Sequence, residues 1–420
     1  YTTLFRSWQK KSFCKIVNCR LLGKKMNKLS ISFVISSLVL AVLGGVKIEK
    51  NDPNNFSIAK QQKTATCQFK PGSPNFLVFA GGGDRYSNEI ALEKNVLYFQ
   101  RTLKNMGFNP LSAGTFFAHG NNEEATIRYL DSEGNQQFKA PIIPYLEGAT
   151  TRRNLQNWLN ETADGTVNSP IFFYFTGHGI KNEEDANNNS LLLWRNKLLS
   201  VQELSQMLDE LPPNIPVVTM MAQCFSGSFA NIIYQGGDPN KPVALQTRCG
   251  FFATIKTLPS VGCTPEVNEA DYEDYSSSFF AGLSGINRLG EKVASADYNG
   301  DGKVSYNEAH AYAKVDEKTM DLPVSTSEVW LQEMAGENGT VKIWNQGISS
   351  LLATARPEQK YVVNFIVNRF GLDRQKSYLE HGSNLREEML ENEVEKAYFL
   401  RRSEERRVGK ECRSRWSPYH

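Results

Sequence analysis

Two short motifs carry residue types that can act together as a nucleophile and its proton carrier. The first is Thr176–Gly177–His178–Gly179, and the second is Gln223–Cys224–Phe225–Ser226–Gly227. A thiol attacks as its thiolate, and a neighbouring imidazole lowers the pKa that controls this form. The backbone N–H groups of Gly179 and Cys224 are suited to hold the oxyanion that such an attack creates. The two motifs therefore indicate nucleophilic catalysis by a cysteine, provided that the fold brings them together.

The elements that precede the motifs favour such a meeting. Ile171–Phe175 and Val217–Ala222 are apolar runs typical of buried strands, and each leads directly into one motif. In an open parallel sheet, ligands bind beyond the carboxyl ends of the strands. We therefore expect His178 and Cys224 to lie at one sheet edge, although 46 residues separate them. A lone histidine or cysteine is more often a packing residue, so the inference depends on the pair.

Further strands and helices alternate along about 200 residues. Strands are predicted at Phe76–Ala80 and Phe251–Ile255, and Ser200 with Glu203 forms a capping box before a helix. Other helices are predicted at Ile90–Met106, Arg152–Leu159, Asn307–Lys314, Tyr361–Phe370 and Arg386–Leu400. This alternation indicates an α/β fold with a mainly parallel central sheet.

A strand ending in His-Gly, followed by a later strand ending in Cys with Ser-Gly close behind, resembles the caspase-like cysteine peptidases. That family includes caspases, metacaspases and legumains, and the resemblance covers roughly residues 74–290. It implies a three-layer sandwich with helices on both faces of the sheet. It also implies a His178–Cys224 dyad, oxyanion donors at the Gly179 and Cys224 amides, and a polypeptide substrate.

The segment Cys249–Ser278 is similar to the one that forms a wall of the substrate cleft in bacterial relatives. Specificity stays open, because metacaspases carry an Asp two residues before the Cys and this chain has Ala222. An acidic group comprising Glu266, Glu269, Asp271 and Asp274 either forms a negative pocket or is a solvated turn. The candidate cleft residues are Gly177, Gln223, Ser226, Thr254, Asp271, Asp274 and Ser276.

A second constellation, Asp297–Glu308, fits the twelve-residue calcium loop position by position. Gly302 falls where the loop turns sharply, and hard oxygen atoms fall where calcium needs them. The preceding helix of the usual pair is doubtful, so we expect a structural clip rather than a switch. The predicted ligands are Asp297, Asn299, Asp301, the Lys303 carbonyl, Ser305 and Glu308.

Cysteine usage is sparse, with seven in 420 residues. Cys249 and Cys263 flank a predicted strand and its following turn, and an exported protein can pair them in a disulfide. The alternative is two free, packed thiols.

The first residues after Met26 predict export. Lys28 precedes the uncharged run Leu29–Leu43, and Gly44–Gly45 supplies small residues at its end. This is typical of a secretory signal peptide, with an uncleaved anchor as the alternative. We therefore expect a periplasmic or secreted protein without stable membrane insertion after removal of the signal.

The two ends of the chain look foreign to the gene. Tyr1–Ser7 and Arg402–Val408 can be encoded by one DNA string in opposite orientations, which resembles a translated sequencing adapter. Residues 26–401 carry 34 basic and 42 acidic side chains, a net charge of −8. An acidic chain has no electrostatic support for nucleic-acid binding. A composition with 40% hydrophobic and 22% charged residues excludes a largely disordered chain.

These features predict the following organisation: adapter or upstream translation over 1–25, signal peptide 26–45, linker 46–72, peptidase domain 73–345, helical segment 346–401 and adapter translation 402–420. The predicted function is an exported caspase-like cysteine endopeptidase stabilised by calcium. The alternatives are a non-catalytic calcium-stabilised scaffold module and a legumain-like transpeptidase. No cofactor is predicted for catalysis.

Overall fold

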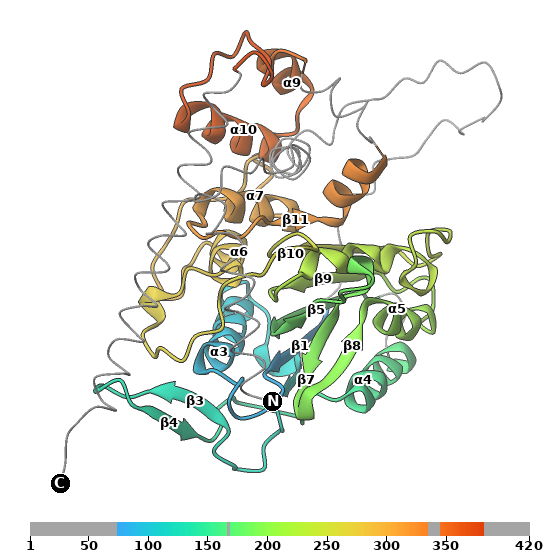
Figure 1. Ribbon diagram of the computed structural model, residues 1–420, viewed down its shortest axis with the longest axis vertical. Helices are drawn as coiled ribbons and strands as arrows, with labels where there is room; N and C mark the ends of the chain where they lie inside the picture. Colours follow the sequence, from blue (N-terminus) through green and yellow to red (C-terminus); the bar gives the residue numbers. More distant parts are fainter. Residues whose placement is uncertain (1–73, 166–168, 335–344, 382–420) are drawn as a thin grey trace, which may run out of the picture.

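A six-stranded sheet forms the centre of the molecule (Figure 1). The structure is a computed structural model that describes residues 74–165, 169–334 and 345–381. Along the sheet the strand order is β11-β10-β9-β5-β1-β2, and only the β10–β11 pair is antiparallel. The strands are β1 (Asn75–Gly81), β2 (Gly114–Phe117), β5 (Ile171–Gly177), β9 (Val217–Met221), β10 (Arg248–Phe252) and β11 (Val324–Ser325).

The inner strands are apolar on both faces because helices cover both sides of the sheet. In β1, Val78 contributes to a core cluster on one face, whereas Leu77 and Phe79 belong to the cluster on the other face. All seven residues of β5 are buried. The fold class is therefore α/β, with a mainly parallel sheet between two helical layers.

The helices divide between the two faces as the core clusters indicate. Side chains of α3, α6 and α7 pack in the cluster on one face, and those of α4 and α5 pack in the cluster on the other (Figure 1). Ser200 and Glu203 form the predicted capping box at the start of α5. The helices are α3 (Ile90–Asn105), α4 (Arg152–Gly165), α5 (Val201–Asp209), α6 (Tyr275–Ser284), α7 (Tyr306–Asp316), α9 (Ile348–Thr354) and α10 (Pro357–Arg369).

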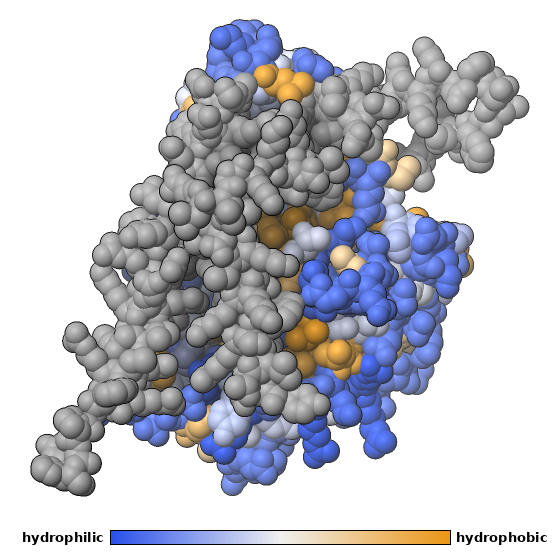
Figure 2. Space-filling view, in the orientation of Figure 1, coloured by the Kyte–Doolittle hydropathy of each residue, from blue (hydrophilic) through white to orange (hydrophobic). Residues whose placement is uncertain are grey.

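The described residues also form a two-stranded sheet and a three-stranded sheet. A hairpin comprises β3 (Ile127–Leu130) and β4 (Gln136–Lys139), and a three-stranded sheet follows β5. That sheet comprises β6 (Gly179–Ile180), β7 (Ser190–Leu193) and β8 (Lys197–Ser200). In the view of Figure 2 the described surface is mostly hydrophilic, with hydrophobic residues gathered in patches near the middle of this face.

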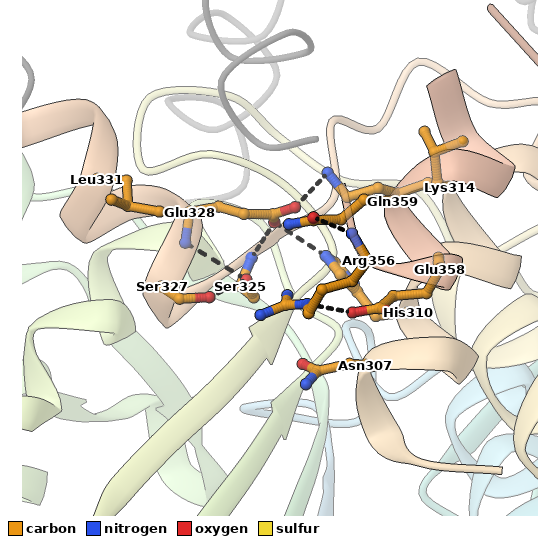
Figure 3. Close-up of a pocket in the computed structure, with 12 residues that line it drawn as sticks. Asn307, His310, Lys314, Ser325, Ser327, Glu328, Leu331, Arg356, Glu358 and Gln359 are labelled. Carbon is orange, nitrogen blue, oxygen red and sulfur yellow. Dashed lines mark hydrogen bonds and ion pairs between the residues drawn. The ribbon is translucent and has the colours of Figure 1, made fainter. Parts of the chain in front are cut away.

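The C-terminal helices pack on α7 rather than forming an isolated segment. Ala311 of α7 shares a third core cluster with Ile348 of α9 and Val363 of α10. In Figure 3, His310 of α7 and Arg356, which precedes α10, both line a small cavity of about 60 Å³. Glu328 accepts from His310 Nε2 at 3.0 Å and from Lys314 Nζ at 3.2 Å, which joins α7 to the helical stretch 326–334. Within the described residues, the predicted boundary near 345 therefore does not separate independent cores.

Most predicted elements are confirmed within a few residues. Strand β10 begins and ends three residues earlier than predicted, at Arg248–Phe252. The predicted helix Tyr361–Phe370 lies in α10, apart from its last residue. The predicted helix Arg386–Leu400, the signal peptide, the linker and both terminal segments lie outside the described residues.

Candidate active site

The two predicted motifs leave neighbouring parallel strands. Strand β5 pairs with β9 in a register that aligns Phe175 with Met221, and the Ala222 N–H donates to the Phe175 carbonyl at 3.0 Å. Continuing this register aligns His178 with Cys224. The prediction that both follow the carboxyl ends of adjacent strands is therefore confirmed.

The backbone brings these two strand ends very close together. An ideal Cβ built on Gly179 would lie 1.9 Å from the Cys224 carbonyl oxygen, so only glycine fits there. Beyond Cys224, Phe225 adopts a left-handed backbone with φ 59°. This turn takes the chain sharply away from β9 and leaves Cys224 at the strand end. The two residues predicted to supply oxyanion amides are thus packed side by side.

The His178 imidazole is held by a residue that the sequence did not single out. His178 Nε2 lies 2.8 Å from the Ser87 carbonyl and 3.0 Å from Glu89 Oε2. Glu89 is 5% exposed, and its other oxygen accepts from Arg128 Nη2 at 2.6 Å. Glu89 immediately precedes α3, and β1 is the neighbour of β5 in the sheet. Because this link depends on strand order, no local sequence signal revealed it.

This arrangement favours the protonated imidazole. Burial raises the pKa of Glu89, but the charges and hydrogen bonds of His178 and Arg128 outweigh burial and lower this pKa to about 2. Burial lowers the pKa of His178, but the charges of Cys263 and Glu89 outweigh it and hold this pKa well above its usual value. The contacts of His178 therefore favour its protonated form.

Cys263 approaches His178 directly, which corrects the predicted disulfide. Cys263 and Cys224 are both free thiols, whereas Cys249 is disulfide-bonded. The predicted Cys249–Cys263 pairing is therefore wrong. The physical reason is that Cys249 lies within β10, whereas the chain after β10 carries Cys263 to the carboxyl end of β5. There its Sγ lies 3.6 Å from the Gly177 carbonyl oxygen.

The segment Leu258–Pro265, which we call the strap, crosses the carboxyl ends of the strands. The Leu258 carbonyl accepts from the Phe225 N–H at 2.9 Å, just beyond β9. Farther along, the Thr264 carbonyl accepts from the Ala91 N–H at 3.2 Å, at the start of α3. Between these anchors the strap passes over the candidate nucleophile.

The strap contacts the Cys224 thiol through Ser260. The Ser260 N–H donates to Cys224 Sγ at 3.3 Å, and Sγ also lies 3.4 Å from the Ser260 carbonyl oxygen. Burial raises the pKa of Cys224, as does the charge of Cys263, while Ser260 and His178 lower it; the result is about 11. In this covered arrangement the thiol is therefore protonated at neutral pH.

The buried carboxyl group of Asp321 anchors the strap through hydrogen bonds. Asp321 is 7% exposed, and its Oδ2 accepts from Ser260 Oγ at 2.6 Å. Its Oδ1 accepts from the Val261 N–H at 3.1 Å. Burial raises the pKa of Asp321 to about 7, although these hydrogen bonds lower it. The strap is therefore anchored by a buried carboxyl group whose pKa is raised by burial and which shares its titration with Glu317.

Four cleft candidates lie at the strand ends but are packed inward. An ideal Cβ on Gly177 would lie 2.7 Å from the Gly81 carbonyl, so this glycine serves the contact between β5 and β1. Ser226 Oγ accepts from the Thr254 N–H at 3.2 Å, and both residues are fully buried. Gln223 is 1% exposed, and neither atom of its side-chain amide has a hydrogen-bond partner among the described residues.

The three remaining cleft candidates follow the strap. Asp274 caps α6, accepting from the Ser277 N–H at 2.7 Å, and its carboxylate pairs with Arg288 at 3.3 Å. Ser276 is fully buried and accepts from Tyr174 Oη at 2.9 Å. Asp271 is exposed. The structure therefore assigns Asp274 and Ser276 to packing rather than to an open cleft wall, because α6 begins here and takes them into the core.

The predicted calcium loop has a turn that suits the ion. Gly300 and Gly302 adopt positive φ values of 72° and 80°. The Asp297 carboxylate accepts from the N–H groups of Gly300, Asp301 and Gly302 at 2.9–3.1 Å, which directs it into the loop. Helix α7 follows as predicted, and within the described residues no helix immediately precedes the loop.

The exit helix closes this loop with Glu308. This side chain is 2% exposed, and its Oε1 accepts from the N–H of Tyr298 at 3.0 Å and from that of Asn299 at 3.2 Å. Its Oε2 accepts from Ser305 in a capping box. The donor set consists of hard oxygens, which fits calcium. Binding would fall to Asp297, Asn299, Asp301, Ser305, Glu308 and the Lys303 carbonyl.

Comparisons with known proteins add little to this geometry. No protein-family model and no curated protein matches the chain. Among solved structures it is similar to that of protein GSU0716 from Geobacter sulfurreducens, with a TM-score of 0.36 and 12% identity. The match covers 60% of this chain and 92% of that one. None of the helices in the described ranges is long and apolar enough to span a bilayer.

Proposed function

We propose that the protein is an exported cysteine endopeptidase of the caspase-like kind, with Cys224 as nucleophile and His178 as its proton carrier. The observation that carries the proposal is the parallel register of β5 and β9, which aligns the two residues at one sheet edge. Glu89 supports it further, since a buried carboxylate that orients an imidazole is the usual third member of such sites.

In the proposed reaction the Cys224 thiolate attacks the scissile carbonyl carbon and forms a C–S bond. The resulting oxyanion accepts hydrogen bonds from the Gly179 and Cys224 amides. The C–N bond then breaks as the His178 imidazolium gives its proton to the leaving nitrogen. Water attacks the thioester and loses a proton to His178, and the Cys224 thiolate departs.

We infer that the strap moves before a peptide reaches Cys224, which is partly buried beneath it. In the covered arrangement the pKa of Cys224 is about 11, so the thiol carries its proton. Withdrawal of the strap admits water and relieves the burial that raises this pKa, while the His178 charge continues to lower it. The described arrangement is therefore proposed to be the resting state of the enzyme.

The covering strap also favours a second candidate, a calcium-stabilised module that keeps the fold without catalysis. Covalent labelling distinguishes the two. A peptide acyloxymethyl ketone library, varied at P1, is applied to the folded protein and the labelled residue is mapped by peptide mass spectrometry. Label on Cys224 that is lost in Cys224→Ala and in unfolded protein supports the peptidase. A folded protein that no member of the library labels supports the non-catalytic module.

The mapping also tests which thiol reacts. Cys263 is the thiol in direct reach of His178, and it is the matched control for Cys224. We expect the label on Cys224 alone. Label on Cys263 instead would overturn the assignment of the nucleophile.

We further propose that calcium occupies Asp297–Glu308 as a structural clip. The support is the inward-facing Asp297 carboxylate and the closure of the loop by Glu308. Calcium would neutralise the charges of the three carboxylates that the loop carries, those of Asp297, Asp301 and Glu308. No step of the proposed reaction uses it.

A further inference from the structure

Glu89, His178 and Cys263 form a cluster with the chemistry of a transition-metal site. One ligand atom from each residue lies within 4.8 Å of the other two, and no other group of three His, Cys, Asp or Glu side chains in the described ranges meets this condition. The three residues come from different parts of the chain: the residue before α3, the end of β5 and the strap. The fold therefore brings three residues that are distant in the sequence to one point.

The donor atoms discriminate between metals. A thiolate, an imidazole nitrogen and a carboxylate oxygen are the ligands that Zn²⁺ takes, whereas calcium takes oxygen alone. Zinc bonds of about 2.0–2.3 Å place tetrahedral ligand atoms roughly 3.5 Å apart, so inward shifts of about an ångström close the site. We propose that Glu89, His178 and Cys263 bind Zn²⁺, with water as the fourth ligand.

The surroundings hold two of the ligands ready. Arg128 binds the second oxygen of Glu89 at 2.6 Å. The Ser87 carbonyl lies 2.8 Å from His178 Nε2, which leaves Nδ1 as the nitrogen that would bind the metal. Such outer contacts orient the ligands of metal sites. Binding displaces protons from the His178 imidazolium and from any protonated Cys263, and these pass to solvent.

Zinc at this point has a consequence that rests on the proposed function. It occupies the imidazole that Cys224 needs, and it ties the strap to the end of β5 through Cys263. The metal would therefore inhibit the peptidase by holding the covered state. Metal binding itself does not depend on peptidase activity.

Cobalt(II) provides a direct spectroscopic probe of the ligands. The full-length protein is titrated with Co²⁺ in excess Ca²⁺ and a non-chelating reductant, so that the oxygen loop is filled with calcium. We expect tetrahedral d–d bands and a sulfur-to-cobalt charge-transfer band, both removed by added Zn²⁺. Glu89→Gln should weaken binding by about tenfold or more.

Two matched substitutions identify the sulfur. Cys263→Ser should abolish the charge-transfer band, whereas Cys224→Ser, the same change at the neighbouring thiol, should retain it. Folding of each variant is checked by circular dichroism. If Cys263→Ser does not fold, zinc X-ray absorption on the wild-type protein decides, because one sulfur in the shell supports the site. A shell of nitrogen and oxygen alone, a band that survives Cys263→Ser, or a folded wild type without the band would each overturn the proposal.

The predicted inhibition of the peptidase by zinc is measured in a separate experiment. Zinc should slow the labelling of Cys224, and Cys263→Ser should need about tenfold more zinc for half-inhibition relative to its own zinc-free rate. A cobalt band without any labelling leaves the metal site standing and removes the peptidase. Labelling of Cys224 without a cobalt band supports the peptidase and overturns the metal site.

Discussion

At the scale of single residues, the imidazole is the most heavily constrained group of the candidate site. Its ring nitrogen Nε2 faces both Ser87 and Glu89, and Glu89 is itself fixed by Arg128. This chain of contacts holds a positive charge next to two thiols. The protonation state of His178 should therefore depend on Glu89.

Replacing Glu89 by Gln removes the negative charge without changing the shape of the side chain. We expect the pKa of His178 to fall, because a carboxylate at hydrogen-bond distance stabilises the imidazolium. Histidine NMR titration in a chelating buffer measures this. The partly buried His381, whose Nε2 lies 3.0 Å from the Asp373 carbonyl rather than against Glu89, serves as the internal control. An unaltered His178 would contradict the described pairing.

Asp321 predicts a pH dependence of stability. Burial raises its pKa from 3.8 to about 7 on folding, and Asp321 shares this titration with the buried Glu317 carboxyl group, so the folded protein binds the shared proton more tightly than the unfolded chain. The contribution of this group is therefore fully present below pH 3.8 and is lost as the pH rises to about 7. Asp321→Asn should gain stability relative to wild type across this interval. Urea unfolding at several pH values tests it, and a difference that is constant with pH would refute it.

At the scale of elements, the strap is the feature that decides whether the nucleophile is accessible. Its middle is held by two hydrogen bonds to Asp321 and one to the Cys224 sulfur. Of the three donors on the strap, only Ser260 Oγ is a side-chain atom, so this hydrogen bond can be removed by a side-chain substitution within the strap.

Ser260→Ala should make Cys224 more reactive toward a small disulfide reagent. Loss of one hydrogen bond of about 1 kcal/mol raises the open population roughly fivefold. The rate is measured by stopped flow in the Cys263→Ser background, so that Cys224 is the thiol of the candidate site that reacts. Ser112→Ala, in the turn that precedes β2 and so lies at the amino end of that strand, is the matched control and should leave the rate unchanged. Equal rates in both variants would show that the strap does not limit access.

The elements also show how far the sequence could predict the fold. Long apolar runs such as Ile171–Phe175, and the capping box at Ser200, identify buried strands and helix starts because burial and capping are local requirements. Strand β2 has four residues and β11 has two, which is too short for periodicity to register. The alignment of His178 with Cys224 could be predicted from the sequence, because each residue follows the end of a buried strand. The approach of Glu89 and Cys263 depends on which strands are neighbours and on the course of a loop, and neither is a local property.

At the scale of the whole molecule, the calcium loop lies between the sheet and the C-terminal helices. Tyr298, the second residue of the loop, stacks on Tyr361 of α10 with ring centroids 4.2 Å apart. Helix α7 leaves the loop and packs on both the sheet cluster and the C-terminal cluster. An ion in the loop would therefore stabilise the junction of these parts.

Asp297→Ala should lower the melting temperature more in calcium than in chelator, because it removes an ion ligand as well as the acceptor of three backbone N–H groups. At a calcium concentration of one hundred times Kd the wild type gains about 2.7 kcal/mol, which corresponds to a shift of roughly 5 °C or more. Differential scanning fluorimetry with and without a chelator measures the shift. Asp164→Ala, at an exposed position of α4, should respond to calcium as the wild type does. Equal losses for Asp297→Ala in both buffers would contradict the clip.

The cover over Cys224 is encoded after the residue that it covers. Strand β9 ends at Met221, whereas the strap begins at Leu258 and its anchor lies at Asp321. During synthesis the sulfur atom therefore emerges about a hundred residues before the last part of its shield. A growing chain of intermediate length therefore carries Cys224 without the strap and without the carboxyl group that anchors it.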